Sequence, residues 1–195
     1  MSGRFIQRTA CATLPVRTLH GLRPVPPTAS SIAHATTVPH RPAYTVGETT
    51  HGAALFAARD IAAGTTILHI EGRLQQHPTR YSIQLGDAEH IEADGSLPDD
   101  EMRVRHPWRF LNHSCDPNAC VDGRTLLALR PIACGEQITF DYTTTEASMA
   151  EPFACLCGAS GCVGSVQGFL HLHEAQQAAR RTRLAPHLRA LLPVR

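Results

Sequence analysis

Three cysteines in the C-terminal third of the sequence have the residue type and spacing of metal ligands. They are Cys155, Cys157 and Cys162, and Gly158 and Gly161 between them allow the backbone to fold tightly. Thiolates are preferred ligands of zinc, and a structural zinc site takes four protein ligands. The segment therefore predicts a zinc site to which it contributes three ligands. The alternative is a loop with three unligated thiols.

The fourth zinc ligand has to come from another part of the chain. The candidates are Cys115, Cys120, Cys134, His171 and His173, and their spacing alone does not choose among them. The total of seven cysteines is odd, and three of them cluster. This pattern favours a metal site in a reducing, cytoplasmic environment over a framework of disulfides.

A second segment with chemical potential covers residues 109–118, with the sequence RFLNHSCDPN. Its Asn, Ser and Asp side chains compete for backbone hydrogen bonds, and its Pro lacks a donor, so neither a helix nor a strand is expected. The apolar pair Phe110 and Leu111 would anchor the segment in a core. Polar, irregular segments tied to a core often carry binding and catalytic groups. An ordinary surface loop is the alternative.

The composition indicates one globular domain with appendages. The 195 residues are 43% hydrophobic, and the formal net charge is +1 with a pI near 7.7. A nearly neutral chain gives no electrostatic case for direct binding to nucleic acid or to a membrane surface. No apolar run approaches the length of about 18 residues that a membrane-spanning helix needs.

The two ends of the chain differ from its middle. Residues 1–45 are rich in Ser, Thr, Pro and Arg and lack sustained hydrophobic periodicity, so we expect a disordered tail; organellar targeting is the minority alternative. The end of the chain is expected to be helical, with Leu184, Leu188, Leu191 and Leu192 on one face and a break at Pro186. The basic patch of Arg180, Arg181 and Arg183 is interpreted as a solvated helix face.

Short β-prone runs separated by Gly and Asp turns dominate the middle of the chain. The expected strands cover residues 55–56, 65–70, 81–85, 126–129 and 138–142. Residues 59–67 and 130–138 resemble each other, which suggests small sheets with similar corners. The charged stretch 87–105 is expected to connect elements and to contribute little to the core.

The strand at residues 138–142, ITFDY, ends in two aromatic residues that flank a carboxylate. Alone it predicts only a core strand. Together with the segment 109–118 and the three-cysteine cluster, it resembles the SET-domain lysine methyltransferases that carry a post-SET zinc segment. The resemblance covers roughly residues 44–164.

The resemblance implies a fold and a division of the chain. The expected fold is mainly β, a β-clip of small sheets whose pseudoknot-like threading passes Asn112 beside the strand that ends at Tyr142. Residues 46–148 would form the SET domain and residues 149–165 the post-SET zinc segment. Residues 166–195 would be an extension of short helices.

The resemblance also implies a cofactor, S-adenosylmethionine, and the residues that bind it. By their match to the family's motifs these are Gly52, Ala53, Ala54, Tyr81, Arg109, Asn112, His113 and Tyr142. Ala54 stands where the family usually has the second glycine of Gly-x-Gly. Cys115 becomes the favoured fourth ligand of a structural Zn²⁺, beside Cys155, Cys157 and Cys162.

Two aromatic positions carry the chemistry that the resemblance implies. Tyr142 matches the catalytic tyrosine, and Phe140 matches the position that tends to set how many methyl groups are added, which here predicts more than one. Ile70 replaces a tyrosine that usually lines the lysine channel. The expected function is S-adenosylmethionine-dependent methylation of a lysine side chain on a protein or peptide substrate. A catalytically weak SET module that binds a protein, favoured by Ala54 and Ile70, and a zinc-containing nucleic-acid module are the alternatives.

Overall fold

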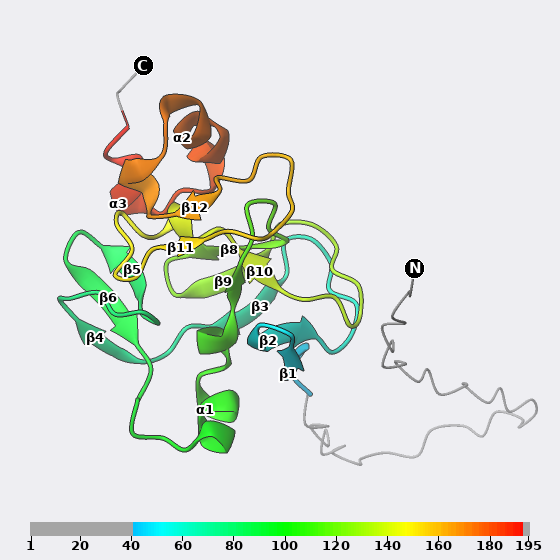
Figure 1. The fold of residues 1–195 in the computed structure, drawn as a ribbon. Coiled ribbons are helices and arrows are strands. Elements are labelled where there is room, and N and C mark those ends of the chain that lie inside the picture. The colour runs from blue at the N-terminus through cyan, green and yellow to red at the C-terminus, as the bar shows by residue number, and fades with distance from the viewer. Residues whose placement is uncertain (1–40, 193–195) are drawn as a thin grey trace, which may run out of the picture.

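In the computed structural model, which describes residues 41–192, the chain folds into small sheets linked by short helices (Figure 1). The strands are β1 (Tyr44–Thr49), β2 (Gly52–Ala57), β3 (Thr66–His69), β4 (Arg73–Gln75), β5 (Ile83–Gly86), β6 (Glu89–Glu92), β7 (Asn112–His113), β8 (Ala119–Asp122), β9 (Thr125–Ala128), β10 (Thr139–Phe140), β11 (Phe153–Ala154) and β12 (Ser165–Val166). The helices are α1 (Asp99–Arg105), α2 (Glu174–Arg180) and α3 (Pro186–Arg189), with 3-10 turns η1 (Pro107–Phe110), η2 (Tyr142–Thr144), η3 (Phe169–His171) and η4 (Arg181–Arg183). The expectation of a mainly β fold is confirmed.

The predicted tail lies almost wholly in residues 1–40, outside the described residues. Its expected boundary at residue 45 is too late, because β1 begins at Tyr44 and Ala43 is already buried. β1 pairs with β2 in an antiparallel hairpin, with Gly47 opposite Ala54. The turn of this hairpin passes through Gly52, whose positive φ of 109° favours glycine.

Two three-stranded antiparallel sheets, in the orders β3-β9-β8 and β4-β6-β5, contribute to the main core together with β2, η1 and the segments between the strands. The largest of its buried side chains are at most 2% exposed: Leu55, Ile70, Ile91, Trp108, Leu126, Ile132 and Ile138. Burial of an aliphatic or aromatic side chain of this size contributes about 1.5–3 kcal/mol, so these contacts hold the small sheets together.

The stretch 87–105 was expected to add little to the core, and this prediction is wrong. It contains β6, whose Ile91 is fully buried, and α1, whose Met102 is 4% exposed. Its charged residues lie on the outer faces of these elements, as in the first turn of α1. The high charge density of the sequence therefore concealed a short amphipathic strand and helix.

The two similar stretches of sequence meet each other in space. Ile61 and Ile132 form an antiparallel bridge, with both backbone hydrogen bonds at 2.9 Å. Gly64 and Gly135 provide the positive-φ turn that follows each of them. The resemblance between residues 59–67 and 130–138 thus reflects two equivalent corners that pair across the core.

The segment 109–118 includes a short strand, contrary to the expectation of a wholly irregular loop. β7 pairs in parallel with β10, with Asn112 beside Thr139. The buried side chain of Asn118 fastens the two segments, since it accepts from the Thr139 N–H and donates to the Gln137 carbonyl. Tertiary pairing here overrides the low strand propensity of Asn and His.

The C-terminal elements form a second, smaller core at one end of the molecule (Figure 1). Its buried members are Phe169, Leu172, Leu184 and Leu188. Pro186 begins α3, a position where the backbone N–H has no partner within the helix, so its absence costs nothing. Leu191 is 54% exposed and therefore does not belong to the apolar face that the sequence predicted. Gly168 lets this unit approach closely, because a Cβ there would lie 2.6 Å from the Ala147 carbonyl oxygen.

Candidate active site and metal site

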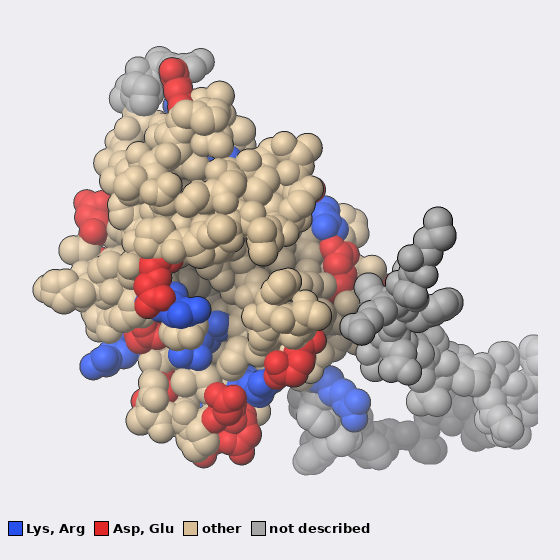
Figure 2. All heavy atoms as spheres, viewed as in Figure 1, with Lys and Arg blue, Asp and Glu red and all other residues tan. Residues whose placement is uncertain are grey.

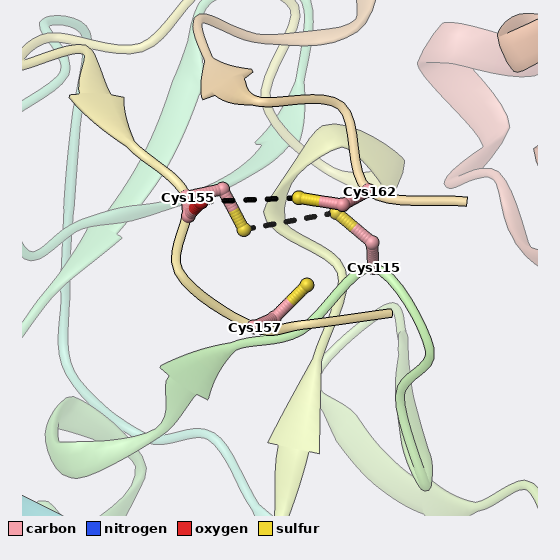
Figure 3. A group of neighbouring side chains, drawn as sticks. All are labelled: Cys115, Cys155, Cys157 and Cys162. Carbon is pink, nitrogen blue, oxygen red and sulfur yellow. Dashed lines mark hydrogen bonds between the residues drawn. The ribbon is translucent and has the colours of Figure 1, made fainter. Parts of the chain in front are cut away.

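Four cysteine side chains converge between β7 and the segment that joins β11 to β12 (Figure 3). The Sγ atoms of Cys115, Cys155, Cys157 and Cys162 all lie within 4.8 Å of one another. Three ligands come from one loop, and the fourth comes from the turn that follows β7, 40 residues earlier in the chain. The cluster joins the three cysteines of the predicted segment with Cys115, the residue that the family resemblance favoured as the fourth ligand.

The geometry of the four thiols fits a tetrahedral zinc ion. Zn–S bonds of about 2.3 Å place neighbouring sulfur atoms about 3.8 Å apart. The Sγ atoms of Cys115 and Cys155 are separated by 3.8 Å. Burial raises the pKa of the Cys115 thiol, so a bound cation is the group that would keep it ionised.

The other candidates for the fourth ligand lie outside the cluster. Cys120 is on β8, and Cys134 belongs to the turn before Gly135. His171 is within hydrogen-bonding distance of Ser148, at 3.2 Å, and His173 caps the N-terminus of α2. The tertiary structure thus brings Cys115, and none of these other residues, to the three-cysteine segment.

His113 connects the cysteine cluster to the strand segment around Tyr142. Its Nδ1 accepts a hydrogen bond from the Tyr142 backbone N–H at 3.2 Å, and its Nε2 lies 3.2 Å from the Cys115 Sγ. Burial lowers the pKa of His113 to about 4, so the ring is neutral near pH 7. With Nδ1 as the acceptor, the ring proton lies on Nε2 and points at the sulfur.

Tyr142 follows β10, and its hydroxyl points toward Leu111, the residue just before β7. The hydroxyl donates to the Leu111 carbonyl at 2.6 Å. Burial, with a contribution from the nearby Glu146 carboxylate, raises the pKa of Tyr142, so the hydroxyl keeps its proton. The Phe140 ring packs against Tyr142 with 4.8 Å between ring centroids.

A cleft opens beside these two aromatic rings, and we call it the Tyr142 cleft. Its walls include Tyr81, Ile83, Arg109, Leu111, Phe140, Tyr142 and Glu146. The guanidinium of Arg109 stacks on Tyr81, 3.9 Å from the ring centroid. The cleft therefore combines apolar and aromatic walls with a small number of charged groups, as ligand sites commonly do.

The predicted cofactor residues fall into two groups. Tyr81, Arg109 and Tyr142 line the Tyr142 cleft, and Asn112 and His113 form β7 next to it. The residues Gly52, Ala53 and Ala54 lie at the start of β2, which packs against η1, the turn that contains Arg109. Both groups of predicted cofactor residues therefore lie next to η1: β2 packs against it, and β7 follows it in the chain.

Ala54 and Ile70 are both buried. Ala54 is fully buried within the β1–β2 hairpin, and Ile70 is 1% exposed in the main core, with its N–H bonded to the Arg124 carbonyl. Neither side chain lines the Tyr142 cleft. The alternative of a catalytically weak module, which rests on the identities of these two residues, stays a prediction.

Asp141, between the two aromatic residues, is buried and paired with a residue that the sequence did not connect to the site. Arg180 of α2 donates from Nε to Asp141 Oδ2 at 2.7 Å and is 3% exposed. The interpretation of Arg180 as part of a solvated face is therefore wrong, whereas its neighbour Arg181 is exposed. Arg180 is the last residue of α2 and follows the exposed Ala178 and Ala179, so the sequence around it gives no sign of a buried partner.

Glu146 is a further site residue that sequence reasoning missed. It is 5% exposed and lines the Tyr142 cleft four positions after Tyr142. The only available signal was this spacing, which brings two side chains to the same side of a helical turn. The walls formed by Ile83 and Met149 were also missed, because apolar residues look alike in the core and in a cleft.

The surface charge is mixed in sign. In Figure 2, acidic and basic side chains are interspersed over the lower part of the face shown, while the upper part, where the C-terminal elements lie, is mostly uncharged. No continuous basic surface is seen on this face. The expectation that the chain does not bind nucleic acid directly stays a prediction. Among residues 41–192, no helix is long and apolar enough to cross a bilayer.

Comparison with known proteins agrees with the motifs. Residues 52–143 match the family described as SET domain. The methyltransferase flvH of Aspergillus flavus is 33% identical over 118 residues, which are 58% of this chain and 59% of that protein. The histone-lysine N-methyltransferase ash1 of Drosophila melanogaster is 35% identical over 122 residues, 55% of this chain and 6% of that one.

The crystal structure of the methyltransferase domain of human SETMAR is 19% identical, with a TM-score of 0.48 over 64% of this chain and 58% of that chain. The chain spans little more than half of the Aspergillus protein and a small part of the Drosophila protein. The family match, these two relatives and the three motifs agree: residues 52–143 of this chain are similar to the SET domain of protein methyltransferases.

Proposed function

We propose that this protein is an S-adenosylmethionine-dependent protein-lysine N-methyltransferase with a structural zinc site. The observation that carries the proposal is the protonated hydroxyl of Tyr142, held by the Leu111 carbonyl at 2.6 Å in the wall of the Tyr142 cleft. The printed names of the relatives, a methyltransferase and a histone-lysine N-methyltransferase, support the same reaction class.

The residues of the cleft suit the cofactor chemically. When bound, S-adenosylmethionine supplies a methyl group on a positively charged sulfur. The Arg109 guanidinium suits a carboxylate, and the Tyr81 ring suits the flat adenine. Asn112 and His113 of β7 would complete this side of the site.

Tyr142 orients the substrate amine in this proposal. Because its proton is donated to Leu111, the hydroxyl oxygen is left as an acceptor for a substrate N–H. Accepting one N–H directs the nitrogen lone pair away from Tyr142 and toward the methyl donor. Alignment of two reactants in this way accounts for much of the rate of a bimolecular displacement.

The amine must lose a proton before it can react. A lysine ammonium has an unperturbed pKa of about 10.4 and no lone pair. Apolar walls such as Phe140 and Ile83 disfavour the charged form and lower that pKa. The same walls exclude water, which would compete for the Tyr142 oxygen.

The test is methyl transfer from labelled S-adenosylmethionine to proteins of a cell lysate, with wild type and Tyr142→Phe. We expect labelled protein with wild type and a rate lower by about 100-fold with Tyr142→Phe, at similar cofactor affinity by calorimetry. The sequence contains no lysine, so label on protein identifies a substrate rather than the enzyme itself. A folded, zinc-loaded wild type that does not bind S-adenosylmethionine would contradict the proposal.

A further inference from the structure

Of the described residues that line the Tyr142 cleft, Glu146 is the one that carries a carboxylate. It is 5% exposed, and its backbone N–H donates to the Tyr142 carbonyl at 2.9 Å. The turn that begins at Tyr142 therefore places this carboxylate in the same wall as the tyrosine ring. A charged group is seldom buried to this extent without a partner.

The two carboxylate oxygens of Glu146 have different surroundings. Oε1 accepts from the Gln84 backbone N–H at 2.9 Å and from the Thr145 hydroxyl at 3.2 Å. Oε2 receives no hydrogen bond from any residue between 41 and 192. Gln84 and Thr145 thus hold the carboxylate in one orientation and leave one oxygen for a ligand.

The positive side chains of the cleft are engaged elsewhere. Arg80 pairs with Glu151 at 3.2 Å, and Arg109 stacks on Tyr81. Neither donates a hydrogen bond to Glu146. Burial raises the pKa of Glu146 to about 7, and a cation beside Oε2 would favour the charged form and relieve this cost.

We propose that Glu146 Oε2 binds the ammonium group of the substrate side chain in the Tyr142 cleft. The proposal rests on the methyltransferase function proposed for the same cleft, and it makes Glu146 a substrate-binding residue. It also names the substrate class, because such a site selects a cationic amine and rejects an uncharged side chain of the same shape. The ammonium would then pass one proton to Glu146 Oε2, which leaves a neutral carboxylic acid and the neutral amine that the Tyr142 oxygen orients.

Binding of small probes tests this without methyl transfer. Butylammonium chloride and 1-butanol, which have similar shapes and differ in charge, are titrated into the zinc-loaded full chain by calorimetry or NMR. Wild type should bind butylammonium at least about tenfold more tightly than butanol, and Glu146→Gln should lose this preference. Glu146→Asp, which keeps the charge, should retain part of it.

The matched control is Glu151→Gln, which removes an exposed carboxylate that pairs with Arg80 at the rim of the cleft. It should bind both probes as wild type does. Equal preference in Glu146→Gln and wild type, or no preference in wild type, would overturn the proposal. Because no methyl group is transferred, failure here is distinct from failure of the lysate assay that tests the methyltransferase function.

Discussion

His113 Nε2 lies 3.2 Å from Cys115 Sγ, so an imidazole of β7 contacts a thiol of the predicted zinc site directly. The opposite nitrogen of the same ring accepts the backbone N–H of Tyr142 at 3.2 Å. One buried ring therefore touches both the metal site and the proposed catalytic residue. Disturbing it should affect metal binding and cofactor binding together.

His113→Ala should weaken zinc binding by about 10–100-fold, because hydrogen bonds to metal ligands orient them. It should also lower the affinity for S-adenosylmethionine, since Tyr142 loses the acceptor of its N–H. Chelator competition measures the first effect and calorimetry the second. His69→Ala, an exposed histidine on β3, is the control. Unchanged zinc affinity in His113→Ala would show that the Nε2–Sγ contact is incidental.

Cys115→Ser should reduce the zinc content of the purified protein from about one ion per chain, because a structural site uses four strong ligands. Elemental analysis measures this directly. Cys120→Ser is the matched control, since Cys120 is a nearby thiol on β8 outside the cluster. The assignment of the fourth ligand fails if the two variants contain equal amounts of zinc.

Phe140→Tyr should shift the products toward a single added methyl group. The Phe140 and Tyr142 rings are 4.8 Å apart in the wall of the Tyr142 cleft. A new hydroxyl there would occupy the space that a methylated amine needs to turn for a second transfer. Mass spectrometry of the labelled substrate distinguishes one, two and three methyl groups. The same distribution from wild type would count against this role of Phe140.

Arg180→Ala should lower the free energy of unfolding by about 3–5 kcal/mol, because it leaves the Asp141 carboxylate buried without its cation. Urea denaturation followed by circular dichroism measures the change. Arg181→Ala removes the same side chain from the exposed neighbouring position and should change stability by about 0.5 kcal/mol or less. Similar losses in both variants would mean that the Asp141 pair is not what stabilises this end of the molecule.

Glu146 should make stability fall as the pH rises. Its folded-state pKa of about 7 lies above the ordinary value of 4.5, so its stabilising contribution is complete below pH 4.5 and is lost as pH rises through 7. The difference between wild type and Glu146→Gln should therefore change by up to about 3 kcal/mol between pH 4.5 and 8. Comparing the two proteins cancels the effects of nearby Tyr142, Arg80, Arg109 and His187. Parallel pH profiles would contradict the raised pKa.

The sequence by itself determined the residues whose role depends on local spacing. Cys155, Cys157 and Cys162 stand close enough along the chain to share an ion in any compact loop, and the structure brings their sulfur atoms together. Phe140, the last residue of β10, and Tyr142, two positions later, could be recognised by the motif and meet in the Tyr142 cleft. Short-range order of this kind depends only on chain geometry.

Only the tertiary structure decided the relationships between distant segments. It brought Cys115 rather than Cys120 to the other three cysteines, paired Arg180 with Asp141 across 39 positions, and buried Ile70 in the main core. It also set Glu146 against the Gln84 N–H, 62 positions away. These contacts depend on how separate elements pack, and the burial that gives a charged or apolar side chain its role is a property of that packing.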